Sequence, residues 1–282
     1  MRLESEVINT VLEFARNDDR IRVVGMEGSR TNKNVPRDEY QDYDISFLVT
    51  DMESFKKSDD WLNIFGERII MQKPEAMALF PPELGSWFSY LMVFADGVKI
   101  DLTLIPLDEL ELYIGGDGLL EIIMDKDRVC RSISPSDREY WVRRPSSAFF
   151  DDCCNEFWFA STYVSKGLCR RELLYASHHM EAIIRVQLLT MLSWSIGVEK
   201  GFSFSIGKHF KYIGKHLTAG QWELLMTTYR MDSKDHCWQA LLAAHELFRE
   251  TAHYVADRLN HPYPDYDERV SRYIAQLKAA LD

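Results

Sequence analysis

The chain has 282 residues, a length that fits two domains of ordinary size, each able to bury its own core. Hydrophobic residues make up 46% of it and charged residues 27%, with only 9 prolines, which excludes long disordered or collagen-like segments. Acidic residues outnumber basic ones 44 to 33, giving a net charge of −11. This charge disfavours nucleic acid as a partner, because phosphates are bound by Lys and Arg, and it favours cationic ligands.

The sequence predicts neither a signal peptide nor a membrane anchor. The opening residues, MRLESEVINTVLEF, carry acids among the apolar residues and lack the basic start and apolar run of a signal peptide. No run of about 18 apolar residues occurs, so no transmembrane helix is expected. The five cysteines lack metal-ligand spacing, and we expect buried thiols rather than disulfides. We expect a cytoplasmic protein with no membrane partner, as a monomer or homodimer.

The first half of the chain alternates helical and extended patterns. Apolar residues in 4–17 recur at helical spacing, which predicts an amphipathic helix. Asp96-Gly97 lies between two β-rich runs and predicts an antiparallel hairpin. Strands are predicted at 21–28, 42–51, 67–73, 87–94 and 98–106. This half therefore predicts an α/β domain with a mixed sheet and helices.

The pattern changes near the segment RSISPSDREYWVRRPSS, whose two prolines and cap residues are typical of a seam between domains. We place the catalytic domain at 1–135 and a second domain, which would complete the acceptor site, at 136–282. Helices are predicted in the second domain at 151–166, 170–199, 208–216, 219–230, 234–259 and 265–281. The second half therefore predicts an all-α helical bundle.

Three acidic residues in the first half indicate a cation site. Asp42 and Asp44 lie two apart at the start of a predicted strand, so both carboxylates face the same side. Asp101 lies among apolar residues of another strand. Burial of an unpaired carboxylate there would cost roughly several kcal/mol unless a metal or a hydrogen-bond donor compensated its charge. Because Mg²⁺ prefers carboxylate, water and phosphate oxygens, we predict that all three acids hold magnesium and are catalytic.

The turn before the acidic strand is suited to a phosphate. Gly28 allows close approach of the backbone, and Ser29 offers a hydroxyl and an amide. A helix that begins here would direct its N–H groups at an anion. Arg30 could add a bidentate guanidinium contact, although an exposed arginine in a loop can equally face water. We predict Gly28, Ser29 and Arg30 as nucleotide-binding residues.

With this Gly-Ser turn, D-x-D strand and third acid, the sequence resembles the nucleotidyltransferase superfamily. The wording of MEGSRTNKNVP, DYDISFLVTD, FPPELGSWFSYLMVF, DLTLIP and DDCCNEFW is similar to the bacterial aminoglycoside 6-adenylyltransferases over nearly the whole chain. The resemblance implies a nucleotidyltransferase-type sheet, ATP as co-substrate and Mg²⁺ as cofactor. It further implies AMP transfer to the 6-hydroxyl of streptomycin with release of pyrophosphate, and thus antibiotic resistance.

A cationic acceptor is expected between the domains, where ligand sites are common. Asp152 and Glu156 lie on one helix face and could bind it, or could complement the dipole of a helix that starts nearby. Glu83 with Trp87 could hold a guanidinium group, or Trp87 could pack in the core.

Two lysines of the second domain are further candidates. Lys166 and Lys211 could reach the triphosphate, although a lysine at a helix C-terminus needs no ligand.

Three other functions are compatible with parts of this pattern. The same acids could transfer a nucleotide to another small hydroxylated acceptor. A non-catalytic nucleotide-binding or interaction module could retain the fold, but the intact acids argue against it. Tailing of nucleic acid would need a basic track, which the charge of −11 disfavours.

Overall fold

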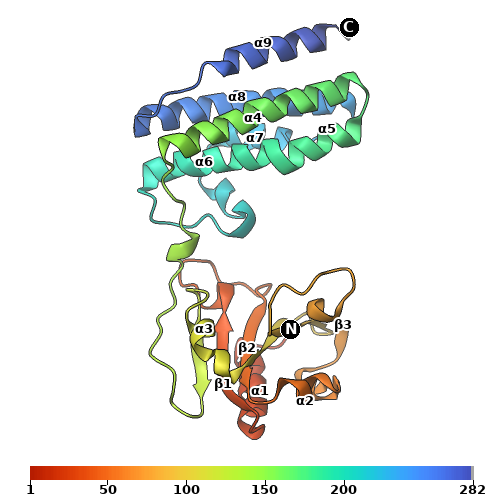
Figure 1. Cartoon of the computed structure of the whole chain (residues 1–282), viewed down its shortest axis with the longest axis vertical. Coiled ribbons are helices and arrows are strands. Elements are labelled where there is room, and N and C mark those ends of the chain that lie inside the picture. The colour runs from red at the N-terminus through yellow and green to blue at the C-terminus, as the bar shows by residue number, and fades with distance from the viewer. Residues whose placement is uncertain (281–282) are drawn as a thin grey trace. The chain divides into compact units, whose positions relative to one another are not determined.

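The structure is a computed structural model that describes residues 1–280. It divides into two compact units, Met1–Glu139 and a second unit that begins at Tyr140 (Figure 1). The boundary falls inside the proline-containing segment that the sequence marks as a seam. The first unit holds a mixed sheet with helices and the second is helical, so the predicted fold class is confirmed.

In the part of the first unit that the structure describes, six strands form one sheet in the order β3-β4-β5-β2-β1-β6. Neighbours are antiparallel except for the parallel pair of β2 and β5. The strands are β1 (Ile21–Glu27), β2 (Tyr43–Val49), β3 (Arg68–Gln72), β4 (Phe88–Phe94), β5 (Lys99–Pro106) and β6 (Glu121–Asp125). The five predicted strands and the β4-β5 hairpin are confirmed.

Apolar residues cover both faces of this sheet. Tyr43, Ile45 and Phe47 belong to one core cluster, which also takes the buried face of α1 (Glu4–Asn17). Leu48 points to the opposite face and joins a second, smaller cluster. Alternating side chains of β2 are thus fixed on both sides, which holds the start of this strand in register.

The second unit is built from α4 (Ser147–Cys169), α5 (Leu173–His179), α6 (Arg185–Lys200), α7 (Ala219–Thr227), α8 (Lys234–Leu259) and α9 (Tyr266–Ala279). A π-helical turn, Met180–Ile184, joins α5 to α6. Figure 1 shows α4, α6 and α8 side by side, and their inward faces form one large core. All five cysteines are free thiols, and Cys153, Cys154 and Cys237 are buried as predicted, whereas Cys130 and Cys169 are only partly buried.

The helix predicted at 208–216 is wrong. This segment contains only two 3₁₀ turns, Lys208–Phe210 and Ile213–Lys215. His209 and Phe210 both have positive φ, 55° and 60°, and Gly207 before them has φ 76°. Three residues with left-handed φ cannot continue an α-helix, so the apolar spacing of the segment reflects packing of a loop.

One helical stretch, Leu173–Lys200, is long and apolar enough by composition to cross a membrane, with a mean hydropathy of 1.2 in its most apolar window. In the helical unit 56% of that window is buried. Its α6 part packs against α8 and α4. The core of this unit therefore accounts for the apolar character of the stretch.

Candidate active site

The three predicted acids lie at the same end of the two central strands of the sheet. Strands β2 and β5 run parallel with Asp44 directly beside Asp101. Asp42 immediately precedes β2, and Lys99 opens β5. The Lys99 ammonium lies 2.7 Å from Asp42 Oδ2 and 2.6 Å from Asp101 Oδ2. Sequence reasoning missed Lys99, although its position two residues before Asp101 places both side chains on one face of the strand.

The surroundings of Asp44 disfavour its charged form. Burial, together with the charges of Asp101 and Asp42, raises the pKa of Asp44 to about 6. Burial lowers the pKa of Lys99, but its hydrogen bonds with Asp101 and Asp42 outweigh this and hold the pKa above its usual value. Lys99 therefore stays protonated and supplies part of the positive charge that the site needs.

The donor set fits a hard divalent cation. Asp101 Oδ1 is buried and has no hydrogen-bond partner, so one oxygen of this carboxylate is unsatisfied. Oxygen donors of this kind are those that Mg²⁺ prefers. Among residues 1–280, however, no three acidic, His or Cys side chains already lie close enough to hold an ion. The Lys99 ammonium instead bridges Asp42 and Asp101.

The Gly-Ser turn packs directly against Asp44. Gly28 has φ 74°, and a Cβ atom placed on it would lie 2.2 Å from Asp44 Oδ2. Glycine is therefore required both by the backbone and by the carboxylate beside it. The helix that the sequence suggested here is a single 3₁₀ turn, Gly28–Arg30.

Gly28→Ala is expected to displace Asp44 and to lower transfer activity at least tenfold. Because alanine is strained at a positive φ, the variant should also lose about 1–2 kcal/mol of folding stability. Gly201 is the matched control, since it has φ 83° and nothing within 4 Å of an added Cβ. Gly201→Ala should lose similar stability and keep its activity. Thermal unfolding and kcat separate the two effects, and equal activity in both variants would contradict the role of Gly28.

The predicted phosphate contact of Arg30 does not fit its placement. Its side chain is only 5% exposed, and its guanidinium donates to the carbonyl oxygens of Asp42 (3.0 Å) and Gln41 (2.6 Å). It also pairs with Glu4 at 3.0 Å and lies 3.6 Å from the centre of the Tyr43 ring. Arg30 therefore anchors the backbone that leads into β2 and so positions Asp42.

Arg30→Met should destabilise the first unit by about 2 kcal/mol, because buried carbonyls lose charge-assisted donors. Transfer activity should fall as well, since Asp42 loses its anchor. Arg37→Met is the control: Arg37 also binds Glu4 and donates to the carbonyl oxygen of Arg30, but it is exposed, and exposed ion pairs contribute about 0–1 kcal/mol. Urea denaturation of both variants checks this, and similar losses would contradict a larger contribution from the buried Arg30.

A cavity of about 250 Å³ lies beside the carboxylates and is lined by Glu27, Trp87 and Tyr113, among others. Burial raises the pKa of Glu27 to about 7, and its carboxyl accepts a hydrogen bond from the Tyr113 hydroxyl. Sequence reasoning missed Glu27, although it stands directly before Gly28 and pairs with Asp44 across the sheet.

Glu83 and Trp87, which were predicted to bind a guanidinium group, differ in their exposure to solvent. Glu83 is exposed, whereas Trp87 is partly buried and packs edge-on against Tyr113 with ring centres 6.1 Å apart. The indole N–H donates to Glu109 Oε2 at 2.6 Å. Trp87 thus has the core contacts that were its alternative reading, and a substrate contact by either residue stays a prediction.

Asp152 and Glu156 both line a pocket of about 560 Å³ within the helical unit, together with Phe149 and Trp194. The alternative that these acids complement a helix dipole is wrong. Within α4 as described, the first turn contains no acidic residue, because the helix begins at Ser147 and Ser146 caps it. Two carboxylates beside two aromatic rings form a site with the chemistry of a cation receptor.

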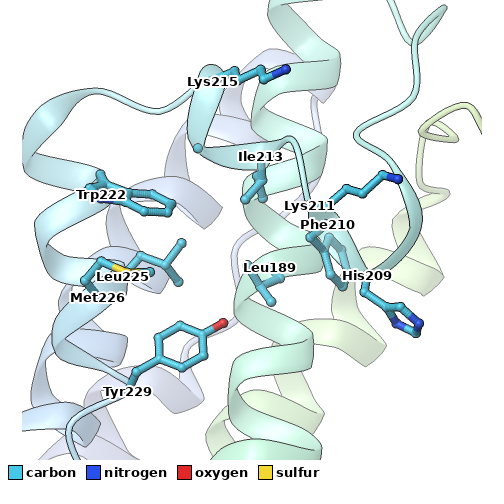
Figure 2. Close-up of a pocket in the computed structure, with 11 residues that line it drawn as sticks. Leu189, His209, Phe210, Lys211, Ile213, Lys215, Trp222, Leu225, Met226 and Tyr229 are labelled. Atoms are coloured by element: carbon cyan, nitrogen blue, oxygen red, sulfur yellow. The ribbon is translucent and has the colours of Figure 1, made fainter. Parts of the chain in front are cut away.

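The two predicted lysines of the helical unit are both exposed. Lys166 lies in the last turn of α4, with its ammonium 5.9 Å from the Tyr273 ring centre. Lys211 lies after α6 and lines a different pocket (Figure 2). Their contact with a triphosphate stays a prediction.

Comparison with known proteins decides the family. A model of the streptomycin adenylyltransferase family matches residues 1–277. The chain belongs to this family. An aminoglycoside 6-adenylyltransferase of Bacillus subtilis (strain 168) is 52% identical over 275 residues, which are 97% of each chain. One of Campylobacter jejuni is 51% identical over 279 residues, 99% of this chain and 96% of that one.

A crystal structure of an aminoglycoside 6-adenyltransferase from Bacillus subtilis is 47% identical, covers 99% of both chains and gives a TM-score of 0.49. Membership of the streptomycin adenylyltransferase family confirms the resemblance found in the motifs and the enzyme class, a nucleotidyltransferase. Adenylyl transfer also implies ATP as the co-substrate.

Proposed function

We propose that this chain transfers AMP from Mg-ATP to the 6-hydroxyl of streptomycin, releases pyrophosphate, and thereby confers antibiotic resistance. The observation that carries the proposal is that Asp44 and Asp101 lie side by side on adjacent parallel strands, with Asp42 just before the first of them and the Gly28 turn against Asp44. Family membership and the names of the relatives support an aminoglycoside as acceptor. The reaction takes place in the cytoplasm, where ATP is available.

Asp42, Asp44 and Asp101 would hold magnesium. When bound, magnesium would supply positive charge that attracts the triphosphate to these strand ends and stabilises charge developing on its oxygens. Gly28 keeps the turn close to Asp44, and the amide and hydroxyl of Ser29 contact a phosphate there. Arg30 keeps Asp42 in place through the backbone.

Asp101 would lie nearest the incoming hydroxyl. Its Oδ2 pairs with Lys99 while its buried Oδ1 has no partner and can accept a proton or a ligand bond. The acceptor oxygen attacks the α-phosphorus, the bond to pyrophosphate breaks, and the hydroxyl proton passes to a base. Asp101 serves as that base, as a metal ligand, or as both.

The acceptor is recognised by its positive charge. Asp152 and Glu156 pair with guanidinium groups of streptomycin, while Phe149 and Trp194 of the same pocket offer ring faces on which such planar cations stack. Glu83 and Trp87 remain proposed contacts, and Lys166 and Lys211 remain proposed contacts of the triphosphate.

Pyrophosphate release with ATP, magnesium and a panel of aminoglycosides tests the reaction. Streptomycin should be turned over at least a hundredfold faster than aminoglycosides that lack guanidinium groups. Release only with an unrelated acceptor would overturn the assignment of the acceptor, and no release with any acceptor would overturn the assignment of the activity.

Asp152→Asn with Glu156→Gln should raise KM for streptomycin about tenfold or more with little change in kcat, because ground-state and transition-state binding are lost together. Asp151→Asn is the matched control, since Asp151 is adjacent and exposed but contacts the Tyr266 hydroxyl instead of lining the pocket. Equal KM values in the natural chain and the double variant would remove these acids from the acceptor site.

A further inference from the structure

The Lys99 ammonium lies between two of the acids that would hold magnesium. Its Nζ is 2.7 Å from Asp42 Oδ2 and 2.6 Å from Asp101 Oδ2, so one positive charge contacts carboxylates of two chain segments. Asp44 stands directly beside Asp101 on the parallel strand. Carboxylate oxygens that converge on one charge are also what a bound magnesium ion requires. Lys99 and the metal therefore need the same oxygens.

The backbone of the sheet fixes this place for Lys99. Lys99 and Asp101 lie two residues apart on β5, so their side chains share one face of the strand. The parallel pairing of Tyr43 with Ile100 brings the residues before them, Asp42 and Lys99, alongside each other. The contact of Lys99 with both acids thus follows from strand register and not from the conformation of a loop.

Lys99 is held by charge and not by burial. Its side chain is 34% exposed, and those of Asp42 and Asp101 are 42% and 24% exposed. Ion pairs that water reaches in this way contribute only about 0–1 kcal/mol each, and a lysine side chain is flexible. Arg30 differs, because its guanidinium is buried and donates to backbone carbonyl oxygens. A cation that enters the site can therefore displace Lys99 at small cost.

The ammonium satisfies only part of what Asp101 can accept. Oδ2 of this carboxylate pairs with Lys99, whereas Oδ1 is buried and has no partner. Magnesium takes an octahedral set of oxygen ligands, which water and phosphate oxygens complete. A metal that arrives with a triphosphate thus brings more ligands to the exchange than the metal alone.

We propose that Lys99 is a resident counter-ion that competes with magnesium for Asp42 and Asp101, so that the metal binds weakly alone and more tightly together with the triphosphate. The inference rests on the magnesium site of the proposed function. In the metal-free protein Lys99 is a positioning residue that holds the two acids together. Once displaced, its ammonium is attracted by the negative charge of the triphosphate, which favours the exchange.

Titration of the full chain with Mn²⁺ without nucleotide, followed by the electron paramagnetic resonance signal of the free ion, tests the proposal. Mn²⁺ suits the same oxygen ligands as magnesium. Lys99→Met removes the competing charge and should tighten Mn²⁺ binding about tenfold. Lys99→Arg keeps the charge and should bind Mn²⁺ as weakly as the natural chain. Equal or weaker Mn²⁺ binding by Lys99→Met would overturn the proposal, whereas AMP transfer by the natural chain separately tests the proposed function.

Two further variants locate the effect. Lys73→Met is the matched control, because Lys73 pairs with Asp59 at 2.8 Å and their side chains are 35% and 32% exposed. It should leave Mn²⁺ binding unchanged. Asp44→Asn added to Lys99→Met should weaken Mn²⁺ binding at least about tenfold, since a charge of the site is lost. Unchanged binding in the double variant, or an equal gain in the control, would overturn the proposal.

Thermal unfolding supplies a second readout. In EDTA, Lys99→Met should melt about 2–4 °C below the natural chain, because three carboxylates then lie together without their counter-ion. Excess Mg²⁺ without nucleotide should restore most of this loss and should raise the melting temperature of the natural chain less. A loss that Mg²⁺ does not restore would show a purely structural role for Lys99 and would overturn the proposal.

Discussion

Asp44→Asn and Asp42→Asn are each expected to abolish adenylyl transfer, leaving less than a tenth of the natural kcat, while the fold stays intact. Each change removes a charge from the set that would hold magnesium, next to Asp101 on the parallel strand. Asp19→Asn, an exposed acid of the same unit, is the control for loss of charge. More than a tenth of kcat in both variants would remove these acids from the metal site.

Asp44→Asn should also stabilise the metal-free protein. The raised pKa of Asp44, about 6, means that the folded state binds this proton more tightly than the unfolded state, where the pKa is about 4. Stability from the neutral carboxyl is therefore fully present below about pH 4 and is lost as pH rises through 6. The variant should gain on the order of 1–3 kcal/mol at pH 7.5 in EDTA and nothing at pH 4, as measured by thermal unfolding.

Asp101→Asn is expected to separate chemistry from ATP binding. Affinity for Mg-ATP should stay near that of the natural chain, because Ser29, Asp42 and Asp44 carry most of it. kcat should fall by about two to four powers of ten, since the acceptor hydroxyl loses its proton acceptor and part of its metal coordination. The buried Oδ1 of Asp101, without a partner in the structure, is the atom that the change disables.

The readouts are kcat at saturating streptomycin and the ATP dissociation constant from calorimetry. Asp101→Glu keeps the charge and controls for the shape of the site. If ATP affinity collapsed while kcat at saturation stayed near its natural value, Asp101 would be a nucleotide-binding residue and the assigned role would be wrong.

Period-two patterns and turn residues were sufficient to predict the centre of the sheet. The spacing of Asp42 and Asp44 predicted that both lie on one side of their strand, and the Asp96-Gly97 turn predicted the β4-β5 hairpin. Three elements of five residues each were missed, because so short a segment shows neither period clearly: α2 (Met52–Lys56), α3 (Leu110–Ile114) and β6 (Glu121–Asp125). β3, which is equally short, was predicted from its β-rich run.

The site was predictable where chemistry follows from spacing along a strand, and not where it depends on contacts between distant segments. The pairing of Asp44 with Asp101 needed only the strands, whereas the burial of Arg30 depends on carbonyls eleven and twelve residues away and on Glu4. An arginine after a Gly-Ser turn looks the same in sequence whether it binds phosphate or its own backbone. The left-handed backbone conformation of His209 and Phe210 could not be predicted for the same reason, since it depends on packing with other segments.

The mass and linkage of the product formed from streptomycin, ATP and magnesium test the central claim most directly. The account predicts that streptomycin gains the mass of one AMP residue, attached through a phosphodiester at its 6-hydroxyl, in equal amount to the pyrophosphate released. The Asp101→Asn variant should form this product at a rate about two to four powers of ten lower than that of the natural chain. Streptomycin recovered unmodified by the natural chain, with ATP intact, would contradict the claim.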